Sequence, residues 1–214
     1  MLGWQIWLPV NPILDMTDLD RYRLPPLHYV MMGLKNPGGY DEADHMASRA
    51  LPDAAARTAR AKEQIAARLK AYGPAGLLDH IRRKLAYTWA DGTYFGSYKL
   101  SIDPIRPGPL QAWVTSEGDH WPVFRCLANA QQLILCAGAA IAAVAAARRR
   151  SLCGLSWVCL TSLLGAGLFF LVWETRSRYL VNLLPLLLLE ASRGIRSVCA
   201  ALPAPPWRGL FPRR

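Results

Sequence analysis

The feature that most constrains this fold is an unbroken run of uncharged residues between positions 127 and 147. Its 21 residues would form a helix about 31 Å long, which is enough to cross the hydrocarbon core of a bilayer. The run is rich in alanine and contains Gly138, and small residues allow helices to pack closely within a membrane. The sequence therefore predicts a membrane-spanning helix that packs against other helices.

Two further apolar runs follow the first. Residues 151–173 carry no charge and end in a tryptophan, which suits a membrane–water interface. The run 179–189 is shorter and is followed by charged residues, so it also fits a buried helix or a re-entrant segment. We predict spans at about 127–147, 151–173 and 179–195, within a transmembrane region covering 126–200. The expected fold class is an all-α membrane protein with two to three transmembrane helices.

The charge distribution supports this class and predicts an orientation. The formal net charge is +10, but residues 1–120 hold 14 basic and 13 acidic groups, whereas residues 121–214 hold 11 basic and 2 acidic groups. The basic excess therefore flanks the predicted spans, which disfavours nucleic acid as a partner. Eight arginines lie on the side that carries the loop 148–150 and the tail 201–214, against three on the other side. The positive-inside rule then places that loop and the Pro/Arg tail in the cytoplasm and residues 1–125 outside.

The outer region, residues 1–125, is predicted to be helical and loop-rich. One helix should run from about residue 53 to Tyr72, end at Gly73-Pro74, and be followed by a second helix over 75–90. The apolar positions of the second helix lie at helical spacing, and its other face is polar and basic. This helix fits either a position on the membrane surface or ordinary packing against its neighbour. The residues on its two faces are Leu77, Leu78, Ile81, Leu85 and Trp89, against His80, Arg82, Arg83 and Lys84.

The beginning of the sequence carries no signal for export. Residues 1–14 have no basic region and are too short to span a membrane. We therefore expect the chain to be the C-terminal portion of a longer membrane protein, with unaided translocation of the N-terminal tail as the alternative.

The motifs of soluble enzymes are absent. The sequence contains no Walker A loop, dinucleotide-binding fingerprint, serine-hydrolase elbow or zinc-protease motif, and it implies no cofactor. The cluster Asp41-Glu42-Ala43-Asp44-His45 has the ligand types of a metal site, but acids in the first turn of a helix give the same pattern. We favour the helix start and predict no metal. The five cysteines lie in or beside the apolar runs and give no disulfide framework.

Three stretches of sequence are more distinctive. The first is His28-Tyr29-Val30-Met31-Met32-Gly33-Leu34 followed by Gly38-Gly39-Tyr40, which alone would be a packed segment entering a turn. The second is Thr88-Trp89-Ala90-Asp91-Gly92-Thr93-Tyr94-Phe95, which also fits a helix end capped by Gly92. The third is Trp173-Glu174-Thr175-Arg176-Ser177-Arg178-Tyr179-Leu180, with Pro185 beyond it.

The third stretch contains the candidate binding residues Glu174, Arg176 and Arg178. An arginine side chain binds phosphate through a planar fork, so a lipid-linked phosphate at the membrane face is a reasonable ligand. An internal pair between Glu174 and an arginine, or contact with lipid headgroups, is the alternative.

Together and in this order, the three stretches resemble the C-terminal part of bacterial polytopic glycosyltransferases of the protein-mannosyltransferase-like (GT-C, family 39-like) superfamily. The resemblance covers residues 25–191. It implies transfer of a sugar from a polyprenyl-phosphate donor outside the cell membrane. The catalytic acid of that family lies on its first outer loop, for which this chain has no matching region, so the catalytic residues are unknown and the chain alone is expected to be inactive.

Two other functions compete with this one. A non-catalytic membrane subunit or scaffold could assemble with other membrane helices through the small residues of the first span. A transporter fragment is disfavoured, since no span carries a central ionisable residue. The expected partners are thus membrane lipid, a polyprenyl-phosphate sugar and other membrane helices.

Overall fold

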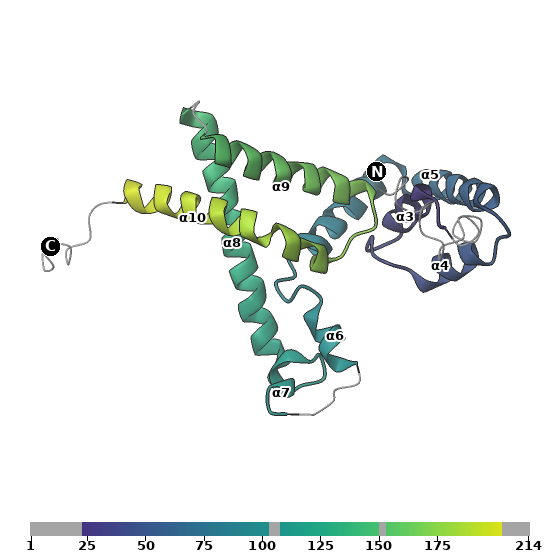
Figure 1. The fold of residues 1–214 in the computed structure, drawn as a ribbon, viewed down its shortest axis with the longest axis horizontal. Coiled ribbons are helices and arrows are strands. Elements are labelled where there is room, and N and C mark those ends of the chain that lie inside the picture. Colours follow the sequence, from purple (N-terminus) through teal and green to yellow (C-terminus); the bar gives the residue numbers. More distant parts are fainter. Residues whose placement is uncertain (1–22, 103–107, 150–152, 203–214) are drawn as a thin grey trace, which may run out of the picture. The chain divides into compact units, whose positions relative to one another are not determined.

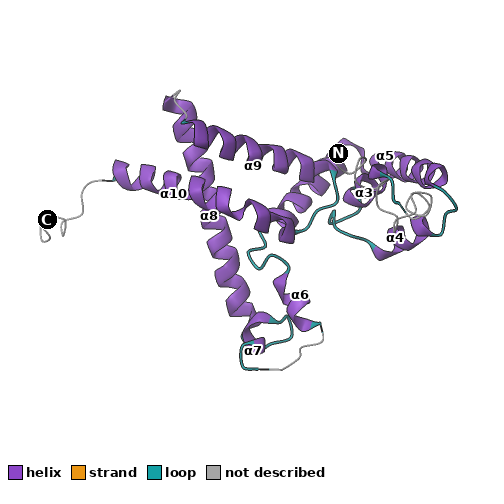
Figure 2. Ribbon diagram, viewed as in Figure 1, coloured by secondary structure: helices purple, strands orange, loops and turns teal. Residues whose placement is uncertain are grey.

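The structure is a computed structural model that describes residues 23–102, 108–149 and 153–202. The described residues form helices joined by loops and contain no strand, as Figure 2 shows, which confirms the all-α prediction. The chain divides into two compact units. The first comprises Met1–Thr88 and Leu168–Arg176, and the second comprises Trp89–Gly167 and Ser177–Arg214.

The first unit contains two short helices, α3 (Pro26–Gly33) and α4 (Glu42–Arg49). A proline at the first helical position suits the start of α3, because its fixed φ is already helical. The Asp41 side chain caps α4 by accepting a hydrogen bond from the amide of Asp44 at 2.8 Å. The acidic cluster at 41–45 is therefore a helix start, as predicted. Within the described residues, no group of side chains is arranged to hold a metal ion.

The long helix α5 (Ala54–Trp89) is two helices that meet at a kink. Gly73 has a φ of 57° and a ψ of −176°, and Pro74 follows it, so the helical hydrogen bonds are broken there. Asp53 caps the first half by accepting from the amide of Ala56 at 2.7 Å. The two predicted helices and the break between them are confirmed.

The second half of α5 differs from the prediction in which side chains it exposes. Leu78 is 69% exposed and Leu85 is 41% exposed, whereas His80 and Lys84 are only 2% and 1% exposed. Two members of the predicted polar and basic face, His80 and Lys84, are therefore buried, while Arg82 and Arg83 stay exposed. His80 and Lys84 bury because their nitrogen atoms find backbone carbonyls in the first unit, as described below. The exposed leucines leave the membrane-surface position of this helix as a prediction.

The second unit contains the long apolar helices. Its elements are α6 (Gly96–Ser101), α7 (Gln111–Val114), α8 (Trp121–Arg149), α9 (Gly154–Val172), η2 (Ser177–Leu183) and α10 (Leu184–Ala201), with the last turn of α9 belonging to the first unit. Among the described residues, Trp121–Arg148 and Gly154–Val172 are long and apolar enough to cross a membrane. The first two predicted spans are thus confirmed as helices, and the first begins at Trp121 because Pro122 suits a first turn.

The third predicted span has a different form. Residues 177–183 form a 3₁₀ helix, and the α-helix begins only at Leu184, next to Pro185, which lacks the amide that would continue a preceding turn. The helix α10 then continues to Ala201, beyond the predicted end at 195. It does not reach the length and apolarity that α8 and α9 show in the described part of the chain, so a third span stays a prediction.

Helix α10 crosses α8 (Figure 1), and small residues at the crossing bring the two backbones together. A Cβ atom on Gly194 would lie 1.8 Å from the carbonyl oxygen of Gly138, so a larger residue there would force the helices apart. Leu135 and Ala139 of α8 form a buried cluster with residues of α10 beside this point. The close packing predicted for the first span is confirmed, and its partner is α10 of the same chain.

The charges of α10 are paired inside the second unit. Glu190 is 1% exposed, and its carboxylate accepts from Ser156 Oγ of α9 at 3.1 Å and from Arg193 Nη1 at 2.9 Å. A buried carboxylate is tolerated in apolar surroundings only when it is paired and hydrogen-bonded, and both conditions are met here. These contacts also link α9 to α10.

Candidate functional site

The residues that follow α9 are held in the first unit by the 28–40 segment. The amide of Glu174 donates to the carbonyl of Tyr29 at 3.0 Å, and the amide of Thr175 donates to the carbonyl of Gly38 at 2.9 Å. The ring of Trp173 stacks on that of Tyr29, with centroids 5.2 Å apart and planes 13° from parallel. The first distinctive stretch and the beginning of the third are therefore joined within the first unit.

Two glycines of the 28–40 segment are required by this arrangement. A Cβ atom on Gly33 would lie 2.6 Å from the carbonyl oxygen of Val172 and 2.7 Å from the carbonyl carbon of Trp173. Gly38 has a φ of +101°, which favours glycine, and a Cβ atom there would lie 2.7 Å from the Lys84 side chain. These positions admit the backbone of residues 172–173 on one side and Lys84 on the other.

Three side chains of α5 fix the carboxyl end of α3. Lys84 Nζ donates to the carbonyl of Gly33 at 2.7 Å, and His80 Nε2 lies 3.1 Å from the same oxygen. The Tyr72 hydroxyl donates to the carbonyl of Leu34 at 2.9 Å. The last carbonyls of a helix have no partner within the helix, so these contacts satisfy groups that would otherwise be buried without a hydrogen bond.

Lys84 also reaches the end of α9. Its Nζ donates to the carbonyl of Leu171 at 3.1 Å, so one ammonium group joins the ends of two helices within the first unit. Burial lowers the pKa of Lys84 to about 8, and the negative charge of Glu174 acts in the opposite direction. One turn further along, Thr88 Oγ1 lies 3.1 Å from Thr175 Oγ1.

In the second unit, Asp91 of the second stretch organises its own turn and holds Ser177. Its carboxylate accepts from the amide of Thr93 at 3.0 Å, from the amide of Phe95 at 3.2 Å and from the Ser177 hydroxyl at 2.5 Å. An aspartate that accepts from the amide two residues later forms a turn typical of this residue type. Asp91 is thus the anchor of the residues that begin η2.

The interpretation of Gly92 as a helix cap is wrong. Helix α5 ends at Trp89, and Gly92 is not among the described glycines with a positive φ. Glycine is needed here because a Cβ atom would lie 1.9 Å from the carbonyl oxygen of Ala128 in α8. The amide of Gly92 donates to Asn129 Oδ1 at 3.0 Å, which fixes this close approach.

The three predicted binding residues fall in different units. Glu174 and Arg176 belong to the first unit, where Glu174 is 5% exposed and the Arg176 guanidinium lies 6.0 Å from the centre of the Tyr40 ring. Arg178 belongs to the second unit and is exposed, with its guanidinium 5.1 Å from the centre of the Tyr179 ring. The structure therefore brings Glu174 and Arg176 into one unit and leaves Arg178 outside it.

Sequence reasoning missed Lys84 and Asp91. The sequence places Lys84 on a polar and basic face, and its position four residues after His80 is a signal that the two act together. Asp91 lies in a stretch that fits a helix end, and Asp-Gly-Thr is also a turn sequence. Neither signal identifies the distant carbonyl or hydroxyl that each residue contacts.

The helical fold and the two long apolar helices fit an integral membrane protein. Comparison with known families agrees with this class. The chain belongs to the family described as "conserved hypothetical integral membrane protein", whose profile matches residues 17–197. No curated protein and no solved structure matches the chain.

The buried Lys84 gives the stability of the protein a defined pH dependence. Its pKa is about 8 in the folded protein and about 10.4 in an unfolded chain. Between these values the unfolded state binds more protons, so the free energy of unfolding should rise as the pH increases from about 8 to about 10. Thermal unfolding of the reconstituted chain, followed by circular dichroism, measures this rise.

The variant Lys84→Met keeps most of the side-chain length and removes the charge, so it should lose this rise. Lys62 is exposed on the first half of α5, and Lys62→Met should keep the wild-type rise. An equal rise in the wild type and in Lys84→Met would show that the ionisation of Lys84 is not linked to folding.

Proposed function

We propose that this chain is part of a membrane glycosyltransferase and holds a polyprenyl-phosphate-linked sugar donor at the outer face of the cell membrane. Membership of an integral membrane protein family and the two apolar helices support a location in the membrane. The resemblance of the three distinctive stretches to GT-C glycosyltransferases supports the reaction class. The proposal assigns this chain to donor binding and leaves the catalytic acid unassigned.

The observation that carries the proposal is how the residues after α9 are fixed. Glu174 and Thr175 donate backbone hydrogen bonds to the 28–40 segment, and Ser177 donates to Asp91. Each contact constrains the backbone within its own unit, close in sequence to Arg176 or Arg178 and directly after a helix that can cross a membrane. A backbone held in this way offers arginine side chains at a set depth, where a polyprenyl phosphate would present its charge while its tail stays in lipid.

The three candidate residues take different roles in this proposal. Arg178 is exposed and would contact the phosphate directly, and Arg176, in the first unit, is kept as a candidate on the sequence alone. Glu174 is buried, so it would orient an arginine and not meet the substrate. An arginine also binds a lipid headgroup through the same chemistry, so the donor must be distinguished from bulk lipid by experiment.

We further propose the orientation that the arginine count predicts, with residues 1–125 outside and the loop 148–150 and the tail 201–214 in the cytoplasm. Arg150 lies outside the described residues, as does the tail after Leu202. In a cysteine-free background, Arg82→Cys should react with an impermeant thiol reagent in intact cells, because the Arg82 side chain is 84% exposed. Arg149→Cys should react only after the cells are opened. The reverse pattern would overturn the orientation and the outer-face donor site with it.

The donor-binding role is tested on the full chain in phosphatidylcholine nanodiscs titrated with a polyprenyl phosphate. A charge-assisted contact to phosphate is worth roughly 1.5–3 kcal/mol, so Arg178→Ala should weaken binding by about ten- to a hundredfold. Arg178→Lys keeps the charge but loses the planar fork and should recover only part of the affinity. Glu174→Gln should have a smaller effect than Arg178→Ala.

Arg125→Ala provides the matched control, because Arg125 is also exposed and lies on the predicted outer side, near the start of α8. It should bind the polyprenyl phosphate like the wild type. Equal affinity in the wild type and in both Arg178 variants would reject the donor site. The non-catalytic subunit would then be the better explanation, although the small residues of α8 that could serve it pack against α10.

A further inference from the structure

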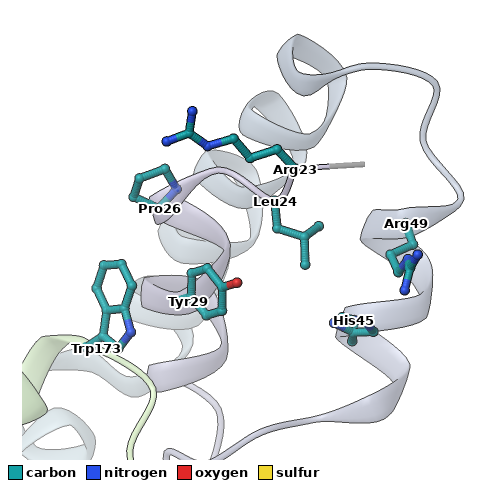
Figure 3. A pocket seen from close by; sticks show the side chains of 7 residues that line it. All are labelled: Arg23, Leu24, Pro26, Tyr29, His45, Arg49 and Trp173. Carbon is teal, nitrogen blue, oxygen red and sulfur yellow. The ribbon is translucent and has the colours of Figure 1, made fainter. Parts of the chain in front are cut away.

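The first unit contains a pocket that the proposed donor site does not use. Its volume is about 530 Å³, within the range of roughly 300–1,000 Å³ typical of small-molecule sites. Figure 3 shows the side chains that line it, which come from α3 and the residues just before it, from α4, and from the residue that follows α9. They are Arg23, Leu24, Pro26, Tyr29, His45, Arg49 and Trp173.

The pocket has an apolar side and a basic side. Leu24, Pro26 and the stacked rings of Tyr29 and Trp173 form the apolar side. His45 and Arg49 lie four residues apart on α4 and so share one face of that helix. Figure 3 shows the Tyr29 hydroxyl directed toward the side that carries these two residues. The pocket thus presents a hydroxyl, an imidazole and a guanidinium among its lining groups.

The charge of the two pocket arginines is not neutralised within the described part of the chain. Arg23 and Arg49 are both exposed there, and neither forms an ion pair. The acids closest in sequence to α4 are already engaged: Asp44 accepts from Arg68 at 2.7 Å, Asp41 pairs with Lys35 at 2.7 Å, and Glu42 accepts from the Tyr40 hydroxyl at 2.7 Å. The rim of the pocket is therefore positively charged.

A buried histidine supports the basic side. His28 is fully buried, its Nδ1 lies 3.0 Å from Ser48 Oγ of α4, and its ring lies 5.9 Å from that of His45. Burial and the nearby charges of His45 and Arg60 lower the pKa of His28. The neutral imidazole holds α4 against α3, so the face carrying His45 and Arg49 is supported by a polar contact beneath it.

We propose that this pocket binds an organic phosphate ester, with the phosphate between Arg49, His45 and the Tyr29 hydroxyl and the organic part against the apolar side. Arginine forks and neutral donors are the groups that bind phosphate oxygens. Arg23 adds positive charge at the rim. The same chemistry fits a soluble sugar phosphate and the phosphodiester headgroup of an anionic lipid.

Calorimetric titration of the full chain in nanodiscs separates these two sources. In phosphatidylcholine discs the probe is glucose 1-phosphate, with glucose as the uncharged comparison. A parallel series uses discs with increasing phosphatidylglycerol, in which a bound headgroup would compete with glucose 1-phosphate. Binding of glucose 1-phosphate that phosphatidylglycerol does not reduce identifies a soluble ester. Binding of glucose 1-phosphate that falls as the phosphatidylglycerol content rises identifies the lipid headgroup as the competing occupant.

The variants assign the binding to this pocket. Arg49→Ala should weaken binding of glucose 1-phosphate by about tenfold or more, and Arg49→Lys should recover part of it. Tyr29→Phe keeps the ring that stacks on Trp173 and removes only the hydroxyl, so it should give a smaller loss. Arg82→Ala removes one exposed charge elsewhere in the same unit and should bind like the wild type.

No binding of glucose 1-phosphate in phosphatidylcholine discs, or equal weakening by Arg49→Ala and Arg82→Ala, would overturn the proposal. Because this probe has no lipid tail and the variants lie in α3 and α4, the result is independent of whether Arg178 binds a polyprenyl phosphate.

Discussion

Two backbone hydrogen bonds support much of the first unit, those from the amides of Glu174 and Thr175 to the carbonyls of Tyr29 and Gly38. They join residues that are more than a hundred positions apart in the sequence. Such a connection requires the two backbones to approach closely, which explains glycine at position 33. It also places the end of α9, a helix long and apolar enough to cross a membrane, against a loop-rich region whose own short helices contribute few buried apolar residues.

Polar and charged groups take the place of an apolar core at several points. Lys84 fixes backbone carbonyls in the first unit, and Glu190 with its partners Ser156 and Arg193 fixes α9 to α10 in the second. Apolar side chains such as Leu78 instead face outward. This distribution suits a protein that is surrounded by lipid along part of its surface, because lipid gives apolar side chains little reason to bury and makes unpaired polar groups costly.

The sequence predicts the elements of this fold better than the contacts between them. Long runs of uncharged residues predict α8 and α9, and Gly73-Pro74 predicts the kink in α5. Both signals are local in the sequence. The late start of α10 depends on the 3₁₀ turn before Pro185, and the burial of Lys84 depends on carbonyls 51 and 87 residues away. The division of the predicted arginine site between two units is likewise a property of tertiary structure.

The structure of the first unit depends on the attachment of residues 174–175 to the 28–40 segment. Amide hydrogen exchange measures that attachment directly. The amides of Glu174 and Thr175 should exchange slowly in the reconstituted chain, because both residues are buried and both amides donate to backbone carbonyls. Gly33→Ala, which puts a Cβ atom 2.6 Å from the carbonyl oxygen of Val172, should accelerate their exchange. Gly165→Ala in α9 meets nothing within 4 Å and should leave it unchanged. Fast exchange of both amides in the wild type, or equal rates in the wild type and Gly33→Ala, would contradict the account.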